Sequence, residues 1–132
     1  MYYLHKACIK PASRAFMHSL KKTKMFKIVY DSGQKTVNSL FVMYVYTNNC
    51  TYNRLGISVS KKVGNAVTRN RLRRLIKESC RLESGCIKCG FDIVVVARQV
   101  AGTLQRDGLF HKVDKALRNL FMRMSLLVET DG

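Results

Sequence analysis

The stretch at residues 54–81 constrains the fold of this chain more than any other part of the sequence. Apolar Leu55, Ile57 and Val59 alternate there with small residues, a pattern that predicts a strand with one buried face. A corner that contains a glycine follows, and Asn65 is placed to cap the start of a helix that fills the rest of the stretch. The sequence therefore predicts a strand, a tight corner and a helix in direct succession.

The predicted helix has an apolar stripe and, on another side, a row of polar and basic residues. The stripe consists of Leu72, Leu75, Ile76 and Ser79. The row, here called the basic ridge, consists of Asn70, Arg73, Arg74, Lys77 and Arg81, offset by 3, 4, 7 and 11 from its first member. Side chains three and four residues apart stack on one helix face. Glu78 is the one acid among nine Lys and Arg residues in this stretch, so the ridge repels itself unless an anion binds there.

The corner before the helix predicts a second place for an anion. Lys61 and Lys62 lie close to the helix N-terminus, whose exposed N–H groups and dipole favour phosphate. Arg69 and Arg71 follow within the first two turns and extend that site. The alternative is a solvated basic face without a partner, which is disfavoured because charges of one sign are costly at this density.

The charge balance of the whole chain favours a polyanionic partner. Its 132 residues carry 24 Lys and Arg against 8 Asp and Glu, a formal net charge of +16. Six Tyr and six Phe are available to stack on bases, so we expect nucleic acid as the partner rather than a membrane surface. No apolar run approaches the ~18 residues that a spanning helix needs, and no membrane binding is expected. The length is that of one domain able to bury its own core.

The five cysteines predict reduced thiols and a cytoplasmic location, because their number is odd and no secretory segment is evident. Cys86 and Cys89 form a C-x-x-C pair with Cys80 nearby, but the second pair of a zinc ribbon is missing. We therefore expect neither zinc nor any other metal site in the protein.

The first part of the chain predicts an arm and a helix. Residues 1–18 contain no acid and show no period, which favours a basic, flexible N-terminal arm over the alternative of a transit peptide. A helix is expected to begin with Ser19 or Thr23 as its N-cap and to end near Asp31. Phe26 and Tyr30 on this helix are either core residues or a stacking platform for bases, and periodicity alone favours the core.

Residues 36–47 then predict one long strand that is apolar on both faces. One face carries Leu40, Val42, Tyr44 and Tyr46, and the other carries Phe41, Met43 and Val45. A turn at 48–53 is expected to lead into the strand at 54–60, paired antiparallel with the first.

The remaining chain predicts a central strand and a closing helix. The continuous apolar run at 91–97 is typical of a strand covered on both faces, reached from the strand at 54–60 by a parallel crossover. A last helix from about Asp107 carries on one side Phe110, Val113, Leu117, Leu120, Met124 and Leu127. The result is an α/β (α+β) two-layer sandwich with a single RNA-binding domain at 19–128 and a short tail at 129–132.

Residues 56–75 also carry a specific resemblance, in the run GISVSKKVGNAVTRNRLRRL. This run resembles the motif of the bacterial ribonuclease P protein family, and the likeness extends over about residues 20–127. The resemblance implies a small mixed sheet with a left-handed βαβ crossover, like the second domain of ribosomal protein S5. It also implies a partner, the catalytic RNA of ribonuclease P, which holds Mg²⁺ and removes the 5′ leader from precursor transfer RNA.

The resemblance further assigns roles to residues by position. It implies contact with the RNA subunit for Lys61, Lys62, Asn65, Arg69, Asn70, Arg71 and Arg74, to which the ridge pattern adds Arg73 and Lys77. It implies a cleft for the single-stranded leader lined by Phe26, Tyr30 and Tyr44. No residue of the protein is expected to be catalytic, because its eight carboxylates form no cluster in the sequence, and no organic cofactor or obligate protein partner is expected. The alternative is a structural RNA-binding protein of ribosomal type without a role in processing.

Overall fold

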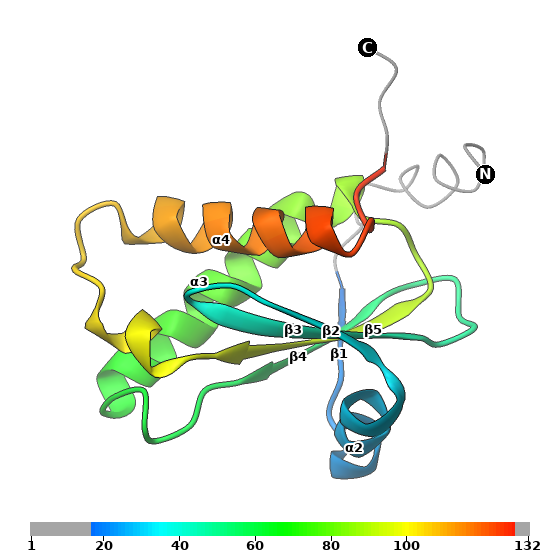
Figure 1. Cartoon of the computed structure of the whole chain (residues 1–132), viewed down its shortest axis with the longest axis horizontal. Coiled ribbons are helices and arrows are strands. Elements are labelled where there is room, and N and C mark those ends of the chain that lie inside the picture. The colour runs from blue at the N-terminus through cyan, green and yellow to red at the C-terminus, as the bar shows by residue number, and fades with distance from the viewer. Residues whose placement is uncertain (1–16, 129–132) are drawn as a thin grey trace.

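The computed structural model describes residues 17–128. Residues 1–16 of the predicted arm and the predicted tail at 129–132 lie outside the described residues. In chain order the elements are β1 (His18–Ser19), α2 (Thr23–Ser32), β2 (Gln34–Val37), β3 (Phe41–Thr47), β4 (Arg54–Ser58), α3 (Ala66–Glu83), η2 (Ser84–Cys86), β5 (Phe91–Ala97), η3 (Gln99–Thr103) and α4 (Leu109–Arg123). Helices α3 and α4 lie on one face of the sheet and α2 lies on the other (Figure 1).

The five strands form one mixed sheet in the order β1-β4-β5-β3-β2. Strand β5 runs parallel to β4 and antiparallel to β3. The predicted mixed sheet and the parallel crossover from β4 through α3 to β5 are therefore confirmed. The predicted antiparallel pairing between the strand at 54–60 and the strand before it is wrong, because β5 lies between β4 and β3.

The single strand predicted over residues 36–47 is also wrong, since it is the hairpin of β2 and β3. Asn38 makes the turn: its Oδ1 accepts hydrogen bonds from the main-chain N–H groups of Leu40 and Phe41, at 3.1 and 3.0 Å. Its Nδ2 donates to the carbonyl oxygen of Ala116 on α4. A short polar side chain that bonds its own following backbone is a standard turn former, and here it interrupts an otherwise apolar run.

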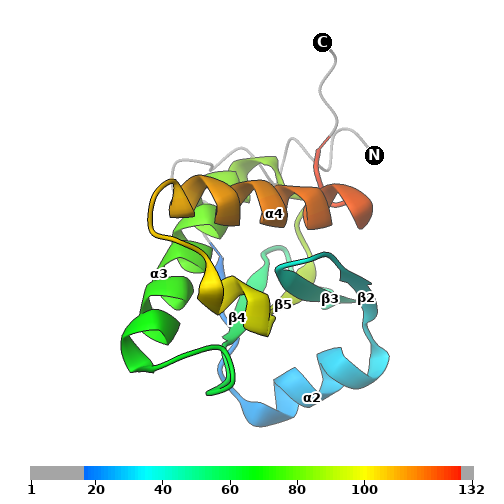
Figure 2. The ribbon, with the colours of Figure 1, turned by 60° about the vertical axis from the view of Figure 1, so that its left-hand side comes forward.

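Strand β5 is covered on both faces, as predicted. Ile93 and Val95 pack in the main core between the sheet and the helices α3 and α4. Val94 and Val96 point to the other face, where Val94 is buried with Val29 of α2. The alternation is confirmed within β3: Phe41, Met43 and Val45 are buried, and Val42, Tyr44 and Tyr46 are half-buried on the other face. Leu40, predicted on the side of Val42, precedes β3 and is buried in the main core instead. Figure 2 shows α2 alone below the sheet, so this second face is only partly covered.

The helix ends differ from the prediction in two places. Lys22 is the N-cap of α2, without a side-chain hydrogen bond, so neither Ser19 nor Thr23 caps it. Helix α4 ends at Arg123, and Leu127, predicted on that helix, instead lies in a bridge with Ile87. Among residues 17–128, no helix is both long and apolar enough to cross a membrane.

Candidate RNA interface

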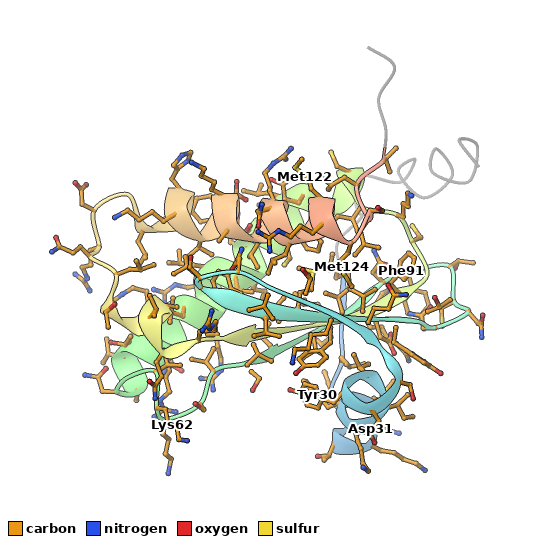
Figure 3. All side chains as sticks on the ribbon, viewed as in Figure 1. Tyr30, Asp31, Lys62, Phe91, Met122 and Met124 are labelled. Carbon is orange, nitrogen blue, oxygen red and sulfur yellow. The ribbon has the colours of Figure 1, made fainter. Side chains whose placement is uncertain are left out.

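The corner between β4 and α3 is held by hydrogen bonds within the corner itself. Asn65 caps α3 as predicted, its Oδ1 accepting from the main-chain N–H of Thr68 at 2.9 Å. The N–H of Val63 donates to the carbonyl oxygen of Ser60, and the Val63 side chain is buried in the main core. Lys62 extends from this corner away from the fold (Figure 3), and Lys61 is exposed as well. The corner is therefore a fixed loop that presents two lysines beside a helix N-terminus.

Two of the predicted contact arginines are partly engaged inside the protein. Arg69 donates from Nε to the carbonyl oxygen of Gly64 at 3.1 Å. Arg73 donates from Nη2 to the carbonyl oxygen of Val59 at 3.1 Å and from Nη1 to Oδ1 of Asn70 at 3.2 Å. These hydrogen bonds link α3 to the backbone at the end of β4 and in the corner. The two arginines therefore help to fix the shape of this surface in addition to giving it positive charge.

The other predicted cations differ from these two. Within residues 17–128, no hydrogen bond or ion pair to another side chain or to the backbone engages the charged groups of Lys61, Lys62, Arg71, Arg74 or Lys77. Arg81, at the end of the basic ridge, is paired with Glu78 through two hydrogen bonds of 3.0 and 2.6 Å, and this pairing lowers the pKa of Glu78. Among the predicted contact residues, the free positive charge therefore lies at the corner and along the first three turns of α3.

The three predicted aromatic residues lie together between α2 and the sheet and are called the aromatic cluster. The rings of Tyr30 and Tyr44 meet edge to face with centroids 4.9 Å apart, and those of Phe26 and Tyr30 are 6.3 Å apart. Tyr30 is 38% exposed, whereas Phe26 and Tyr44 are half-buried against the smaller core cluster. Lys35 lies over the Tyr44 ring at 5.9 Å. The cluster is thus part of the core and part of the surface, and its role as a stacking platform for bases stays a prediction.

Gly56 in β4 makes room for the Phe26 ring. A β-carbon built on Gly56 would lie 2.5 Å from Cζ of Phe26 and 2.7 Å from its Cε1. The ring therefore sits directly on the strand backbone, a close approach that a residue with a side chain would prevent. The sequence places a glycine in an alternating strand, which is a signal of such an approach, but it does not identify the partner.

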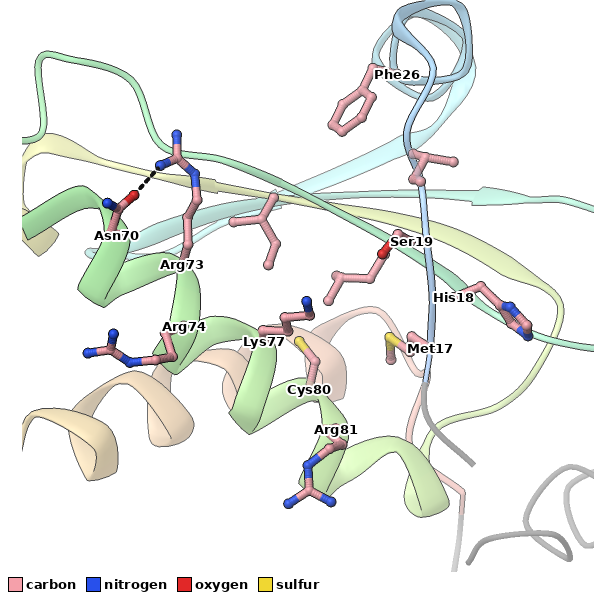
Figure 4. A pocket seen from close by; sticks show the side chains of 13 residues that line it. Met17, His18, Ser19, Phe26, Asn70, Arg73, Arg74, Lys77, Cys80 and Arg81 are labelled. Carbon is pink, nitrogen blue, oxygen red and sulfur yellow. Dashed lines mark hydrogen bonds between the residues drawn. The ribbon is translucent and has the colours of Figure 1, made fainter. Parts of the chain in front are cut away.

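A cavity of about 590 Å³ connects the two surfaces at the open edge of the sheet, and we call it the edge cavity. Phe26 lies at one end of it, and α3 supplies Asn70, Arg73, Arg74 and Lys77 at the other (Figure 4). Its remaining lining comes from β1, β4 and α3, with Met17, His18, Ser19, Leu20, Leu55, Ile57, Cys80 and Arg81. The sequence missed the residues from β1, because a two-residue strand has no period to detect.

The structure does not bring all predicted residues to this cavity. Lys61, Lys62, Asn65, Arg69 and Arg71 lie around the corner at the start of α3, and Tyr30 and Tyr44 lie behind Phe26 in the aromatic cluster. The predicted RNA-subunit residues thus form one continuous surface on the corner and α3. The predicted leader residues form a second surface, and Phe26 and the edge cavity lie between the two.

The cysteines are dispersed. Cys80 is fully buried, and burial, with the carboxylates of Asp114 and Glu83 adding, raises the pKa of its thiol to about 12. Cys50 and Cys86 are free thiols. In the part of the chain that the structure describes, no three His, Cys, Asp or Glu side chains gather in a way that could hold a metal ion.

Comparisons with known proteins agree on one family. The model of the family Ribonuclease P matches residues 16–121. The ribonuclease P protein component of Alkaliphilus metalliredigens is 42% identical over 110 residues, which cover 83% of this chain and 96% of the relative. That of Clostridioides difficile is 46% identical over 110 residues, covering 83% and 93%.

Solved structures show the same likeness in the fold. The RNase P protein of Staphylococcus aureus superposes with a TM-score of 0.72 at 33% identity, covering 85% of this chain and 98% of that one. The RNase P protein of Thermotoga maritima gives a TM-score of 0.72 at 32% identity, covering 87% and 99%.

Proposed function

Since this chain belongs to the ribonuclease P protein family, we propose that its corner and basic ridge bind the RNA subunit and that its aromatic cluster binds the 5′ leader of precursor transfer RNA. The chain is the protein component of an endoribonuclease that processes the 5′ end of transfer RNA. The relatives' names and folds favour this role over that of a ribosomal-type RNA-binding protein.

The supporting observation for the RNA-subunit surface is its free charge. Lys61, Lys62, Arg71, Arg74 and Lys77 have no anionic partner among the described side chains, so their charges are available to phosphates. Each phosphate that they neutralise releases counterions, which makes the affinity fall steeply with salt. The hydrogen-bonded corner adds main-chain N–H groups at the start of α3.

The supporting observation for the leader surface is the half-exposed state of the aromatic cluster. A leader varies in sequence, and its unpaired bases can stack on aromatic rings whatever their identity. Tyr30 offers an exposed ring, and its edge-to-face contact with Tyr44 holds that ring in place. The ammonium group of Lys35 lies 5.9 Å from the centre of the Tyr44 ring and supplies a positive charge for the leader's phosphates.

We assign the hydrolysis and its Mg²⁺ ions to the RNA subunit. The candidate interface is strongly cationic, which suits a phosphate backbone and repels a divalent cation. The protein then contributes affinity and orientation, and it favours precursor over mature transfer RNA because only the precursor has a leader. The cytoplasmic location and the lack of an obligate protein partner remain predictions.

The observation that carries the proposal is that the two surfaces adjoin across the edge cavity. A test compares Phe26→Ala with Arg74→Ala in complexes with a bacterial ribonuclease P RNA. We expect Phe26→Ala to weaken binding of precursor transfer RNA about tenfold, roughly one stacked base, while binding of mature transfer RNA is unchanged. Arg74→Ala is expected to weaken binding of the RNA subunit instead. Equal losses for precursor and mature transfer RNA in Phe26→Ala would contradict the leader assignment.

A further inference from the structure

The open edge of β4 leaves the main-chain N–H and C=O of Ile57 unpaired in the described structure. His18 donates its N–H to the carbonyl oxygen of Asn53, and Leu20 donates to that of Leu55. Odd-numbered residues of β4 therefore point their main-chain groups toward β1, because N–H and C=O of one residue leave a strand on the same side. Strand β1 ends at Ser19, whereas β4 continues to Ser58. The N–H and C=O of Ile57 thus face outward beyond the end of β1.

The carbonyl oxygens on either side of Ile57 along this edge are both hydrogen-bonded. The carbonyl oxygen of Leu55 accepts from Leu20, and that of Val59 accepts from Arg73. Within residues 17–128, no hydrogen bond outside the sheet ladder reaches the N–H or the C=O of Ile57. One donor and one acceptor, side by side, therefore open into the edge cavity that Ile57 lines.

The edge cavity combines an apolar floor with a cationic rim. Leu20, Leu55 and Cys80 are buried and form the floor together with half-buried Ile57 and Phe26. Arg73, Arg74, Lys77 and Arg81 form the rim, and the lining contains no acid. A rim for phosphate alone would need no apolar floor, and an apolar ligand alone would gain nothing from the rim. An unstacked nucleotide fits both, since it joins a flat apolar base with polar edges to a phosphate.

We propose that the edge cavity receives one unpaired nucleotide of the RNA subunit, with its base on the apolar floor and against the free N–H and C=O of Ile57. The inference rests on the proposed function, which supplies the RNA subunit as partner. The cavity volume of about 590 Å³ lies within the roughly 300–1,000 Å³ of ordinary ligand pockets. We assign the nucleotide to the RNA subunit rather than to the leader because α3 supplies the rim, whereas only Phe26 of the aromatic cluster reaches the cavity.

A substitution that fills the edge cavity with a larger side chain tests the proposed nucleotide site without removing any charge. Ser19 is exposed on β1 and lines the cavity, so Ser19→Trp occupies the space while burying no polar group. Gln105→Trp is the matched control, since Gln105 is exposed in the connector before α4, away from the cavity lining. Each variant and the wild-type protein are titrated with a bacterial ribonuclease P RNA over a range of salt. The complexes are then probed with dimethyl sulfate and a carbodiimide, which modify the pairing edges of unpaired bases. Thermal unfolding checks that each variant is folded.

We expect Ser19→Trp to weaken RNA-subunit binding about tenfold and to leave the slope of log affinity against log salt unchanged. The variant loses a contact to a base but keeps every contact to phosphate. One unpaired base of the RNA subunit should be protected by the wild-type protein and by Gln105→Trp and become reactive with Ser19→Trp. The proposal is overturned if the wild-type protein protects no unpaired base of the RNA subunit, or if the protected base stays protected with Ser19→Trp. In both cases loss of affinity in Arg74→Ala would leave the proposed function standing. Failure of the wild-type protein to bind the RNA subunit at all would instead overturn the proposed function.

Discussion

At the scale of single residues, Arg73 and Arg74 are neighbours on the basic ridge with different contacts. The guanidinium of Arg73 is bonded to the carbonyl oxygen of Val59 and to Asn70, whereas that of Arg74 is exposed without such a bond in the described structure. We therefore infer that Arg73 mainly positions the end of β4 and that Arg74 mainly contacts phosphate. The sequence predicted the charge of both side chains but could not separate these roles, because the Val59 carbonyl becomes a neighbour only in the fold.

This difference predicts opposite results for two alanine variants. Arg74→Ala should reduce the slope of log affinity against log salt for the RNA subunit by about one and leave the free energy of unfolding unchanged. Arg73→Ala should lower the free energy of unfolding by about 1 kcal/mol, since it removes the donor to the Val59 carbonyl. Salt titrations and urea unfolding measure both quantities. An Arg73→Ala variant of normal stability with a reduced salt slope would show that this arginine contacts phosphate directly.

Gly56 and Phe26 form a second pair whose roles depend on each other. In Gly56→Ala the added β-carbon meets the Phe26 ring, so the ring must leave its place on the strand. We expect a loss of about 1–3 kcal/mol in the free energy of unfolding and a weaker preference for precursor over mature transfer RNA.

The control for this pair is a double-mutant cycle. In a Phe26→Ala background the ring is gone, and Gly56→Ala should then cost clearly less than it does alone. Urea unfolding of the four proteins gives the coupling. Additive costs would mean that the close approach of Gly56 and Phe26 does not set the ring position.

At the scale of elements, α3 and α4 are joined by a polar cluster in which the two residues from α3, Ser79 and Glu83, are buried. Glu83 at the end of α3 is 8% exposed and accepts a hydrogen bond from Nη1 of Arg118 on α4 at 2.6 Å. Beside it, the hydroxyl of Ser79 donates to Oδ1 of Asp114 on α4, also at 2.6 Å. Burial raises the pKa of Glu83, Arg118 opposes that rise, and Asp114 adds to it. The cluster fixes the helix that carries the basic ridge.

The raised pKa of Glu83 predicts a specific dependence of stability on pH. The unfolded chain releases this proton near the ordinary value of 4.5, before the folded protein does, so stability falls as the pH rises from there through the folded pKa. Glu83→Gln keeps an acceptor for Arg118 without a proton to release. Its stability relative to the wild type should therefore increase between pH 4 and pH 7. Urea unfolding across this range measures the difference, and a constant difference would contradict the raised pKa.

The strands show where prediction from the sequence ends. The bounds of β5 and its cover on both faces followed from a continuous apolar run, and the cap of α3 followed from Asn65. The sequence did not predict the hairpin at Asn38, because the apolar residues on both sides of it read as one continuous strand. In the structure the hydrogen bonds of this single side chain are enough to form the turn. The position of β5 between β3 and β4 was missed because strand order depends on pairing between distant segments, which the period of a single strand does not contain.

At the scale of the whole molecule, the basic residues of α3 and the aromatic cluster meet at one edge of the sheet. The predicted basic and aromatic residues were each found where their local patterns placed them, but their adjacency arises from four elements, β1, β4, α2 and α3. Two residues of β1 complete the edge cavity, and nothing in their sequence distinguishes them. We therefore propose that the molecule acts as a unit with an RNA subunit and that neither surface is sufficient alone.

The most direct test of that claim is cleavage of a precursor transfer RNA at low magnesium by a bacterial ribonuclease P RNA, with and without this protein, beside the protein alone. We expect cleavage at the mature 5′ end only when protein and RNA are combined, because the protein's cations replace part of the magnesium that the RNA needs to bind its substrate. Binding of the RNA without any gain in cleavage would contradict the processing role, and cleavage by the protein alone would contradict the assignment of catalysis to the RNA.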